Sequence, residues 1–365
     1  MLGRRYINDG LPRYILNHIQ IKTKKEIEDK IKNNLYKFEK KSCEICNNLD
    51  FELLSLKDRH GLLTPVSICT NCGLIQTNPR MTQDSYNQFY ELDYRKLYLG
   101  RTNPSTRFFE SQISKGRRIY NFLKNSGLLS KLKKDSLVFE VGCGAGGILH
   151  FFKEKGYNTQ GCDLDKQYLE YGREKFNLNL SYSTIEDIKL EKSPDLIIYS
   201  HVMEHILSPK RELSKVHDIL SNNGLLYIEV PGIRSIPYSH KGNFLAYLQN
   251  AHTYHFTLKS LKSLLEMNKF ILLSGNEYIE SVFKKERVNK SSQYESDYHS
   301  VLTFLKDMET DFFKKKQSTN KLLKLIPDTL YFQFRCLQER NIFLFHFIKK
   351  FLYRLLRKEI KTIIS

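Results

Sequence analysis

The chain has 365 residues, with 58 Lys and Arg against 40 Asp and Glu, which gives a formal net charge of +18 at pH 7. Hydrophobic residues make up 41% and aromatic residues 12%, enough for a sizeable core, so a wholly disordered chain is excluded. No stretch reaches the roughly 18 uncharged apolar residues of a membrane span, and the opening MLGRRYINDGLPRYIL lacks the apolar region of a secretory signal. We therefore expect a cytoplasmic protein.

Composition and patterning divide the chain into segments. Residues 1–41 are Lys-rich, and the spacing of Ile27, Ile31, Leu35 and Phe38 predicts a helical lead. The other predicted segments are a cysteine-containing module at 42–78, a helical linker or lid at 79–134, an α/β domain at 135–286 and a helical, basic region at 287–365.

Seven cysteines occupy positions 43, 46, 69, 72, 143, 162 and 336, an odd count that argues against a disulfide framework. Cys43 and Cys46 form one C-x-x-C pair, and Cys69 and Cys72 form a second, followed by Gly73. Four thiolates can close a tetrahedral zinc site with no open position for catalysis, so the pattern predicts a zinc ribbon with one structural zinc ion, or a platform for substrate. Four unrelated buried thiols are the alternative.

Residues 135–286 alternate short apolar runs with amphipathic stretches, a pattern typical of a doubly wound α/β sheet. The expected strands are Leu137–Val141, Tyr157–Asp163, Asp195–Ser200, Leu225–Val230, Phe270–Ser274 and Tyr278–Phe283. The expected helices lie around 148–155, 165–176, 209–221 and 257–268.

A glycine-rich loop follows the first of these strands. Gly142, Gly144 and Gly147 fit the G-x-G-x-x-G spacing of a dinucleotide fold, which is a weak signal by itself. Glu140, at the end of the strand, suits a cationic ligand better than a pyrophosphate. Asp163 ends the second strand, where one carboxylate can accept both hydroxyls of a ribose. An adenosine with a sulfonium group, S-adenosylmethionine, fits these acids better than NAD.

The motifs FEVGCGAGG, GCDLD, TIED, DLIIYSHVMEHI and LLYIEVPG, in this order, resemble the class I S-adenosylmethionine-dependent methyltransferases. The resemblance implies a Rossmann-like seven-stranded sheet with an antiparallel last strand. The acid usual in the third motif is displaced here to Glu186 or Asp187. The cofactor contacts implied in this part of the chain are Glu140, Gly142, Cys143, Gly144, Gly146, Asp163, Leu164, Ile185, Glu186, Ser200 and His201.

His201, Glu204 and His205 also match H-x-x-E-H, a metalloprotease signature. That chemistry needs both histidines on one helix face, whereas His201 directly follows a predicted strand. The methyltransferase resemblance places His201 beside the cofactor instead.

A small zinc module before a methyltransferase domain resembles the C-methyltransferases of nucleotide-linked deoxysugars, and related enzymes found with surface-polysaccharide genes. The acceptor implied is a small molecule, a sugar or glycan precursor. Tyr86, Tyr90 and Tyr94 recur every four residues. They predict either a stripe that packs on the core or a lid that places Tyr94 over the cofactor.

In the sugar C-methyltransferases the stretch after the fifth strand carries a Glu-His pair, with the histidine proposed as base. His252 matches that histidine, but Ala251 replaces the glutamate, so O-methylation and C-methylation both stay open. His255 is a second candidate, or a packing residue before the helix cap Thr257. Substrate binding and a structural role are the alternatives for His252.

Near the C-terminus, apolar residues alternate with basic ones at helical spacing. The apolar face is Phe347, Ile348, Phe351, Leu352, Leu355, Leu356 and Ile360, opposite Lys350, Arg354, Arg357, Lys358 and Lys361. Such a helix fits peripheral contact with the inner face of a membrane, or packing on protein. The sequence does not determine the oligomeric state.

The sequence therefore predicts methyl transfer to a sugar or glycan precursor, on oxygen or carbon. The net charge and the cysteines also fit an RNA methyltransferase that grips RNA with the zinc module and basic surface. The stretch after the fourth strand, Ser-His-Val-Met, lacks the motifs of base amino-methylation and cytosine C5 methylation, which argues against RNA. A zinc-dependent binding protein with a non-catalytic cofactor fold is the third hypothesis.

Overall fold

The computed structural model describes residues 1–100, 105–286 and 294–323, with side chains up to residue 314. Residues Met1–Glu309 form one compact unit, and Thr310–Ser365 form another. The features below belong to the first unit. Cys336 and the basic amphipathic helix predicted near the C-terminus lie outside the described residues.

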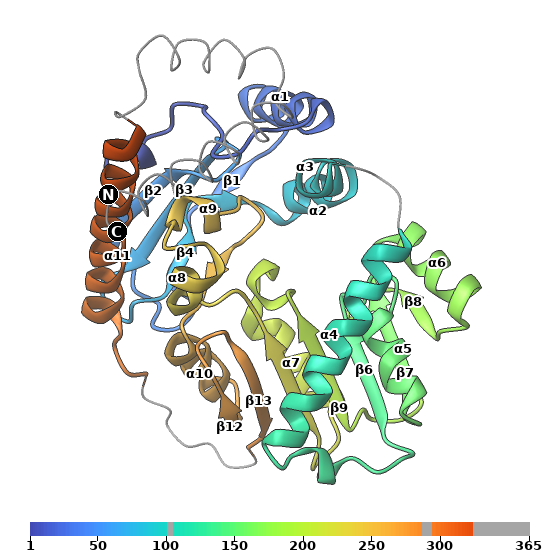
Figure 1. The fold of residues 1–365 in the computed structure, drawn as a ribbon. Coiled ribbons are helices and arrows are strands. Elements are labelled where there is room, and N and C mark those ends of the chain that lie inside the picture. The colour runs from blue at the N-terminus through green and yellow to red at the C-terminus, as the bar shows by residue number, and fades with distance from the viewer. Residues whose placement is uncertain (101–104, 287–293, 324–365) are drawn as a thin grey trace, which may run out of the picture. The chain divides into compact units, whose positions relative to one another are not determined.

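A seven-stranded sheet forms the centre of the unit, in the order β12-β13-β10-β9-β6-β7-β8 (Figure 1). Its strands are β6 (Leu137–Val141), β7 (Asn158–Asp163), β8 (Leu180–Tyr182), β9 (Leu196–Ser200), β10 (Leu225–Glu229), β12 (Phe270–Gly275) and β13 (Glu280–Lys285). Neighbouring strands from β8 to β10 pair in parallel, and β13 is antiparallel to β10 and β12. The expected Rossmann-like sheet with an antiparallel last strand is confirmed, and β8 is an addition to the predicted strands.

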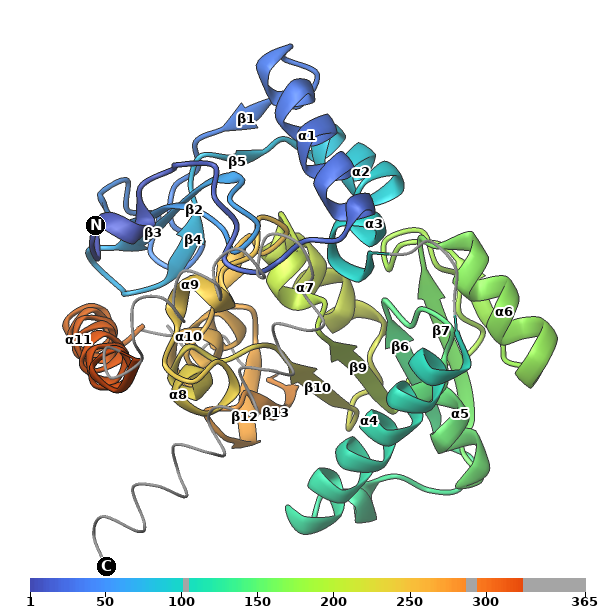
Figure 2. The same ribbon diagram turned by 45° about the horizontal axis from the view of Figure 1, so that its top comes forward.

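The central strands are buried on both faces because helices cover both sides. Side chains alternate along each strand: Val138 and Ile198 join the core under α4, α5 and α6, while Phe139 and Ile197 join the core under α7 and α10. Figure 2 shows α4, α5 and α6 together beside the β6–β7 part of the sheet. These helices are α4 (Thr106–Asn125), α5 (Gly147–Glu154), α6 (Lys166–Phe176), α7 (Pro209–Ile219) and α10 (Leu258–Met267).

A second, antiparallel sheet contains the N-terminal strands, in the order β11-β4-β3-β2. β2 (Phe51–Lys57), β3 (Leu63–Cys69) and β4 (Ile75–Thr77) come from the predicted cysteine module. β11 (Tyr254–His255) belongs to the segment between β10 and α10, and it pairs with β4. The sheet of the cysteine module therefore includes a strand from the α/β segment.

The remaining described elements lie outside these two sheets, and only the part of the last helix up to Glu309 belongs to the first unit. The helices are α1 (His18–Lys32), α2 (Gln83–Leu92), α3 (Tyr94–Leu99), α8 (Ile236–Ser239), α9 (Phe244–Tyr247) and α11 (Tyr298–Leu323). The short turns are η1 (Arg4–Tyr6), η2 (Leu129–Lys131), η3 (Met203–His205) and η4 (Ile233–Ser235), and β1 (Phe38–Glu39) pairs with β5 (Arg80–Met81). No helix within 1–100, 105–286 or 294–323 has the length and apolarity of a membrane span.

The predicted helical lead is shorter than its apolar spacing indicated. Ile27 is buried on α1, but the helix ends at Lys32, Leu35 is exposed and Phe38 lies in β1. Asn34 adopts a left-handed φ of 56°, which an α-helix does not continue through. The extension of the helical pattern to Phe38 was therefore wrong.

The buried carboxyl of Glu212 on α7 makes the stability of the fold depend on pH. The Tyr199 hydroxyl donates to Glu212 Oε1 at 2.7 Å, and burial raises the pKa of Glu212 from 4.5 to about 7. The folded protein binds the proton more tightly than the unfolded chain, so this residue's contribution to stability falls as pH rises from about 4.5 to 7.

We expect Glu212→Gln, which resembles the protonated carboxyl, to raise the free energy of unfolding at pH 8 by up to about 3 kcal/mol, and to have little effect at pH 4. Urea unfolding at both pH values measures this, with the exposed Glu174→Gln on α6 as control. Equal effects of Glu212→Gln at both pH values would show that folding does not raise the pKa of Glu212.

Candidate functional site

The glycine loop joins β6 to α5 and turns sharply. Gly142, Gly144 and Gly146 have φ values of 69°, 54° and 76°, a region that glycine adopts without strain. A Cβ at Gly146 would lie 2.8 Å from the Leu178 side chain, whereas one at Gly144 would meet no atom closer than Gln112 Nε2 at 3.4 Å. The loop is therefore packed at Gly146 and more open at Gly144.

Asp163 lies beside this loop at the carboxyl end of β7. Its Oδ2 accepts from the Gly144 backbone N–H at 2.7 Å, and its Oδ1 accepts from the Asp165 N–H at 2.8 Å. Burial raises the pKa of Asp163, although both backbone donors act in the opposite direction. Each carboxylate oxygen keeps a second lone pair for a ligand, and the neighbouring Leu164 is 58% exposed.

The backbone of Cys143 is occupied within the fold. The N–H groups of Gly142 and Cys143 both donate to the Cys162 carbonyl, at 2.8 and 3.1 Å, and the Cys143 carbonyl accepts from Gly146. Burial raises the pKa of the Cys143 thiol well above its usual value. Cys143 therefore shapes the loop, and its predicted contact with a cofactor stays a prediction.

Glu140 is buried on β6, directly below the loop. It is 2% exposed, and its Oε2 has no hydrogen-bond partner among the described residues. Burial raises its pKa well above the usual range, opposed by the charge of Lys115 on α4. A buried carboxyl without a partner is costly, so its position favours a cationic ligand.

The carboxyl end of β9 presents Ser200 and His201. Ser200 Oγ is buried and has no hydrogen-bond partner in the described part of the chain. His201 has a left-handed φ of 58°, and its ring lies between two carboxylates, 3.2 Å from Glu229 and 3.6 Å from Glu204. Burial lowers the pKa of His201, but the two glutamates outweigh that effect and the net shift is upward.

The residues of the third predicted cofactor motif have partners within the protein. Ile185 is buried in the core beside Val141, and Glu186 forms an ion pair with Arg211 on α7. Thr184 donates to Asp187 at 2.6 Å. The roles of Ile185 and Glu186 toward a cofactor stay predictions.

Four tyrosines on α2 and α3 form a continuous aromatic row, defined by Tyr86, Tyr90, Tyr94 and Tyr98. The Tyr90 and Tyr94 rings stack with centroids 4.4 Å apart, and the His205 ring meets Tyr94 edge-on at 6.1 Å. Burial raises the pKa of Tyr94 to about 12, with the Glu204 charge adding to the shift. Both predicted features, a packed stripe and proximity of Tyr94 to the site, are compatible with this arrangement.

An ion pair ties α3 to the sheet. Arg95 pairs with Asp165, two residues after Asp163, and its guanidinium lies 3.7 Å from the centroid of the Tyr168 ring. The aromatic row is thereby anchored near the carboxyl end of β7.

The segment 249–255, which we term the histidine loop, carries both predicted catalytic residues. Tyr86 Oη donates to the Ala251 carbonyl at 2.5 Å, and Thr77 Oγ1 donates to the His252 carbonyl at 2.8 Å. Next to them, the Thr253 N–H donates to the Glu204 carbonyl at 2.8 Å. The aromatic row, β4 and the turn after β9 therefore position this loop.

His252 and His255 are both buried, with ring centroids 5.7 Å apart. Burial lowers the pKa of His252 well below its usual value, and it lowers that of His255 to about 3. Neither ring nitrogen of His255 has a hydrogen-bond partner among the described residues. The His205 ring lies 4.8 Å from that of His252, so His252 is the member nearer the turn after β9.

The four N-terminal cysteines converge as the spacing predicted. Their sulfur atoms all lie within 4.8 Å of one another, with Cys43 Sγ 3.3 Å from Cys72 Sγ and Cys46 Sγ 3.5 Å from Cys69 Sγ. Hydrogen bonds from Cys43 and Cys72 lower the pKa of the Cys69 thiol. These four thiols can hold a metal ion.

The two cysteine turns have the same backbone pattern. Asn47 and Gly73 each follow the second cysteine of their pair with φ values of 56° and 85°, and their N–H groups donate to the first cysteine's carbonyl. The N–H groups of Cys43 and Cys69 donate in turn to residues 48 and 74. Gly73, singled out in the sequence, needs its glycine because a Cβ there would lie 2.6 Å from the Tyr298 backbone nitrogen.

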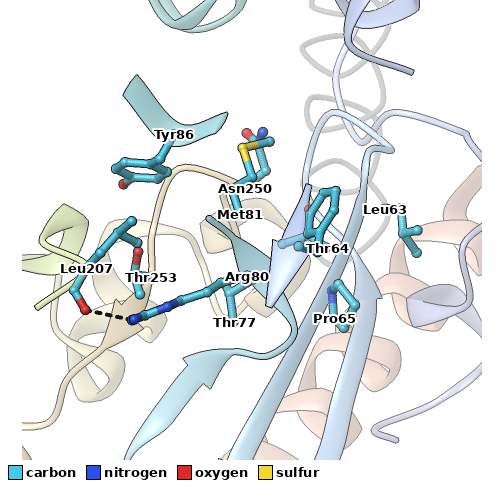
Figure 3. Close-up of a pocket in the computed structure, with 11 residues that line it drawn as sticks. Leu63, Thr64, Pro65, Thr77, Arg80, Met81, Tyr86, Leu207, Asn250 and Thr253 are labelled. Atoms are coloured by element: carbon cyan, nitrogen blue, oxygen red, sulfur yellow. Dashed lines mark hydrogen bonds between the residues drawn. The ribbon is translucent and has the colours of Figure 1, made fainter. Parts of the chain in front are cut away.

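A cavity of about 20 Å³ lies between the cysteine-module strands and the histidine loop, room for one water molecule (Figure 3). Its lining includes Thr77, Arg80, Tyr86, Leu207 and Thr253. Arg80 donates to the Leu207 carbonyl at 2.7 Å. The glycine loop and Asp163 do not line this cavity, so it is separate from the predicted cofactor site.

The sequence alone assigned no role at the cofactor site to three charged residues that lie there. Glu204, Glu229 and Lys115 lie close enough to influence the pKa of His201. Glu204 was visible in H-x-x-E-H, and Glu229 ends a predicted strand in LLYIEV. Lys115 had no local signal, because only the packing of α4 brings it to the site.

Comparison with known proteins finds similarity in the α/β part of the chain. Residues 115–274 match a family described as a methyltransferase domain. A ubiquinone/menaquinone biosynthesis C-methyltransferase of Campylobacter jejuni is 24% identical over 167 residues, 39% of this chain and 69% of that protein. An uncharacterized methyltransferase of Staphylococcus carnosus is 24% identical over 140 residues, 37% of this chain and 67% of that protein.

Among solved structures, the 1,6-didemethyltoxoflavin-N1-methyltransferase of Burkholderia thailandensis matches with a TM-score of 0.43 and 14% identity, over 64% of this chain and 99% of that one. Residues 115–274 thus match a methyltransferase-domain family, and the observed strand order is that of the class I S-adenosylmethionine-dependent methyltransferase fold.

Asp163 gives the most direct test of the cofactor site. We expect Asp163→Ala to weaken binding of S-adenosylmethionine by at least about tenfold, because a carboxylate that accepts ribose hydroxyls contributes roughly 1.5–3 kcal/mol. Isothermal titration calorimetry measures the change. Asp163→Asn, which keeps the side-chain shape, and the exposed Asp135→Asn at the opposite end of the sheet are the controls. Unchanged affinity of Asp163→Ala would refute the assignment.

Proposed function

We propose that this protein transfers the methyl group of S-adenosylmethionine to a small-molecule acceptor, at the carboxyl ends of β6, β7, β9 and β10. The observation that carries the proposal is the convergence of the open glycine loop, the unpartnered carboxyl of Glu140 and Asp163 at one edge of the sheet. Parallel strands direct their carboxyl ends to the same edge, where ligands of open α/β sheets bind.

The residues present fit the cofactor. Glu140 has a buried carboxyl oxygen without a partner next to the glycine loop, and a cation there would favour its ionised form, which suits the cationic part of S-adenosylmethionine. Asp163 faces the same loop with lone pairs for the ribose hydroxyls. Leu164, exposed directly after it, offers an apolar surface for the adenine.

When bound, S-adenosylmethionine supplies a methyl group on a sulfonium sulfur, and the electron pair of the breaking carbon–sulfur bond stays on the product S-adenosylhomocysteine. The chain's residues align the acceptor and exclude water. The acceptor electron pair forms the new bond to the methyl carbon, and a hydroxyl or carbon acid gives its proton to a base.

We propose His252 as the group that accepts the proton, with His255 as the second candidate. Burial lowers the pKa of both rings, so both are neutral at pH 7 and each has a lone pair. His252 is the closer of the two to His205, and therefore to the turn that follows β9.

The way in which the aromatic row covers the site supports a small acceptor. The aromatic row lies against His205, and it is fastened to the histidine loop by Tyr86 and Tyr98 and to Asp165 by Arg95. Helices that are tied down at both sides favour an acceptor small enough to be enclosed. A sugar or glycan precursor is our specific proposal, and the methylated atom is oxygen or carbon.

RNA is the second candidate, favoured by the net charge of +18. The carboxylates around His201 disfavour a phosphate backbone close to the reacting atoms.

For the cysteine cluster we propose one structural zinc ion. Tetrahedral zinc–sulfur bonds of about 2.3 Å place sulfur atoms about 3.8 Å apart, which matches the clustering of the four thiols within 4.8 Å. All four ligands come from the protein, so the ion would join the two cysteine turns rather than activate a substrate.

Purified protein should hold about one zinc per chain after dialysis against metal-free buffer, because a closed four-thiolate site retains its ion. Cys43→Ser combined with Cys69→Ser should lose it, while Cys162→Ala, a buried cysteine outside the cluster, should retain it. Inductively coupled plasma mass spectrometry counts the zinc. A folded wild type without metal would refute the proposal.

The acceptor class is tested with methyl-labelled S-adenosylmethionine and two pools, a nucleotide-sugar extract and total RNA. We expect label in the small-molecule pool, and loss of at least about 90% of it in Asp163→Ala, which follows from tenfold weaker binding below saturation. Label in RNA alone would replace our proposal with the RNA alternative. Binding of S-adenosylmethionine with label in neither pool would favour the non-catalytic hypothesis.

A further inference from the structure

We propose that Glu204, His205 and His252 form a second metal site, separate from the cysteine cluster, which takes a divalent first-row transition metal. The residues come from two loops of the methyltransferase sheet: η3 after β9 carries Glu204 and His205, and the histidine loop after β10 carries His252. One potential ligand atom from each lies within 4.8 Å of the other two.

The distances fit a shared cation. Ligand atoms bound to one metal ion at about 2.1 Å lie roughly 3–4 Å apart. Glu204 Oε1 is 3.8 Å from His205 Nε2, and the third ligand needs only a small contraction. The backbone bond from Thr253 N–H to the Glu204 carbonyl already holds the two loops together.

Unpaired buried polar atoms mark the cluster. Glu204 is 2% exposed, and neither of its carboxylate oxygens has a donor within hydrogen-bond distance among the described residues; the nearest ring nitrogens, His201 Nδ1 and His205 Nε2, lie 3.6 and 3.8 Å from Oε1. His252 is 3% exposed, and its Nδ1 also has no hydrogen-bond partner in the described part of the chain. Such atoms are costly when left unmatched, and a bound cation satisfies several of them at once.

His205 is oriented in the way that metal-binding histidines are. Its Nδ1 lies 2.9 Å from the Ala251 carbonyl, an acceptor, so Nδ1 carries the proton and donates it. In the neutral ring this leaves a lone pair on Nε2, which faces the Glu204 carboxylate. Two electron-rich atoms that face each other attract only through a proton or a cation between them. A backbone carbonyl that fixes the other ring nitrogen is the usual support of a metal ligand.

The ligand set selects the kind of metal. Two imidazoles and one carboxylate suit Mn²⁺, Fe²⁺, Co²⁺ or Zn²⁺ better than Mg²⁺, which prefers oxygen ligands. Three protein ligands also leave coordination positions open, unlike the closed cysteine cluster.

This inference deepens the proposed function, and its role in the reaction rests on that function. An acceptor with an oxygen at an open position would be held in place, its hydroxyl pKa would fall, and the proton that it loses would pass to His255, whose ring nitrogens have no partner among the described residues. His252 would then act by holding the ion rather than by taking the proton itself. The site also favours an oxygen-bearing acceptor over an apolar one.

The test counts metal ions instead of activity. Full-length protein that retains its zinc is dialysed against Mn²⁺, and a parallel sample against Zn²⁺, before mass spectrometric counting. We expect about one additional ion per chain. Glu204→Gln and His252→Gln should each weaken its binding by at least about tenfold, because each removes a direct ligand. His217→Gln, a histidine of α7 that packs on Phe270, is the matched control and should keep the ion.

Binding of S-adenosylmethionine, measured on each sample, separates the outcomes. A wild type that binds S-adenosylmethionine but acquires neither extra ion overturns the inference, and so does unchanged metal binding in both ligand variants. Extra metal that depends on Glu204 and His252, without binding of S-adenosylmethionine, upholds the metal site and overturns the proposed function instead.

Discussion

The pairing of β11 with β4 is the contact on which the rest of the site depends. Tyr254 and His255 pair with Gln76 and Ile75, so the loop between β10 and α10 is held by the cysteine-module sheet. That pairing places the histidine loop against η3 and under the aromatic row. The cysteine cluster lies at the ends of the same β-sheet, so a metal there would stabilise the histidine loop from a distance. The N-terminal module is therefore a structural support of the proposed site.

The charge of the site is opposite to that of the chain. The protein carries a formal +18, yet the carboxyl ends of the central strands gather Glu140, Asp163, Glu204 and Glu229. Lys115 and Arg118 on α4 partly balance them. Buried carboxylates in excess attract cations, which connects two otherwise separate proposals: a sulfonium cofactor near Glu140, and a divalent ion near Glu204. Metal binding at Glu204 would also change the charge that His201 experiences.

Much of the fold was predictable because its signals are local. β6 was predicted residue for residue, since a run of five positions, apolar except for Glu140, ends at a glycine. The spacing of the two C-x-x-C pairs was enough to predict that the four cysteines converge. Leu35 and Phe38 were misassigned because apolar spacing does not report the left-handed Asn34 that ends α1. The tyrosines of α2 and α3 were seen as a stripe, but the partners of their hydroxyls were not predictable.

Local patterns in the chain were thus sufficient for the sheet, the glycine loop with Asp163, and the cysteine cluster. Only the folded chain brings His252 beside Glu204 and His205 and brings Lys115 to the site. The pairing of β11 with β4 also arises only in the folded chain. The physical reason is that periodicity and short motifs encode which face of an element is buried. They carry no information on which distant segment will cover that face, and two residues at β11 are too few to leave a pattern of their own.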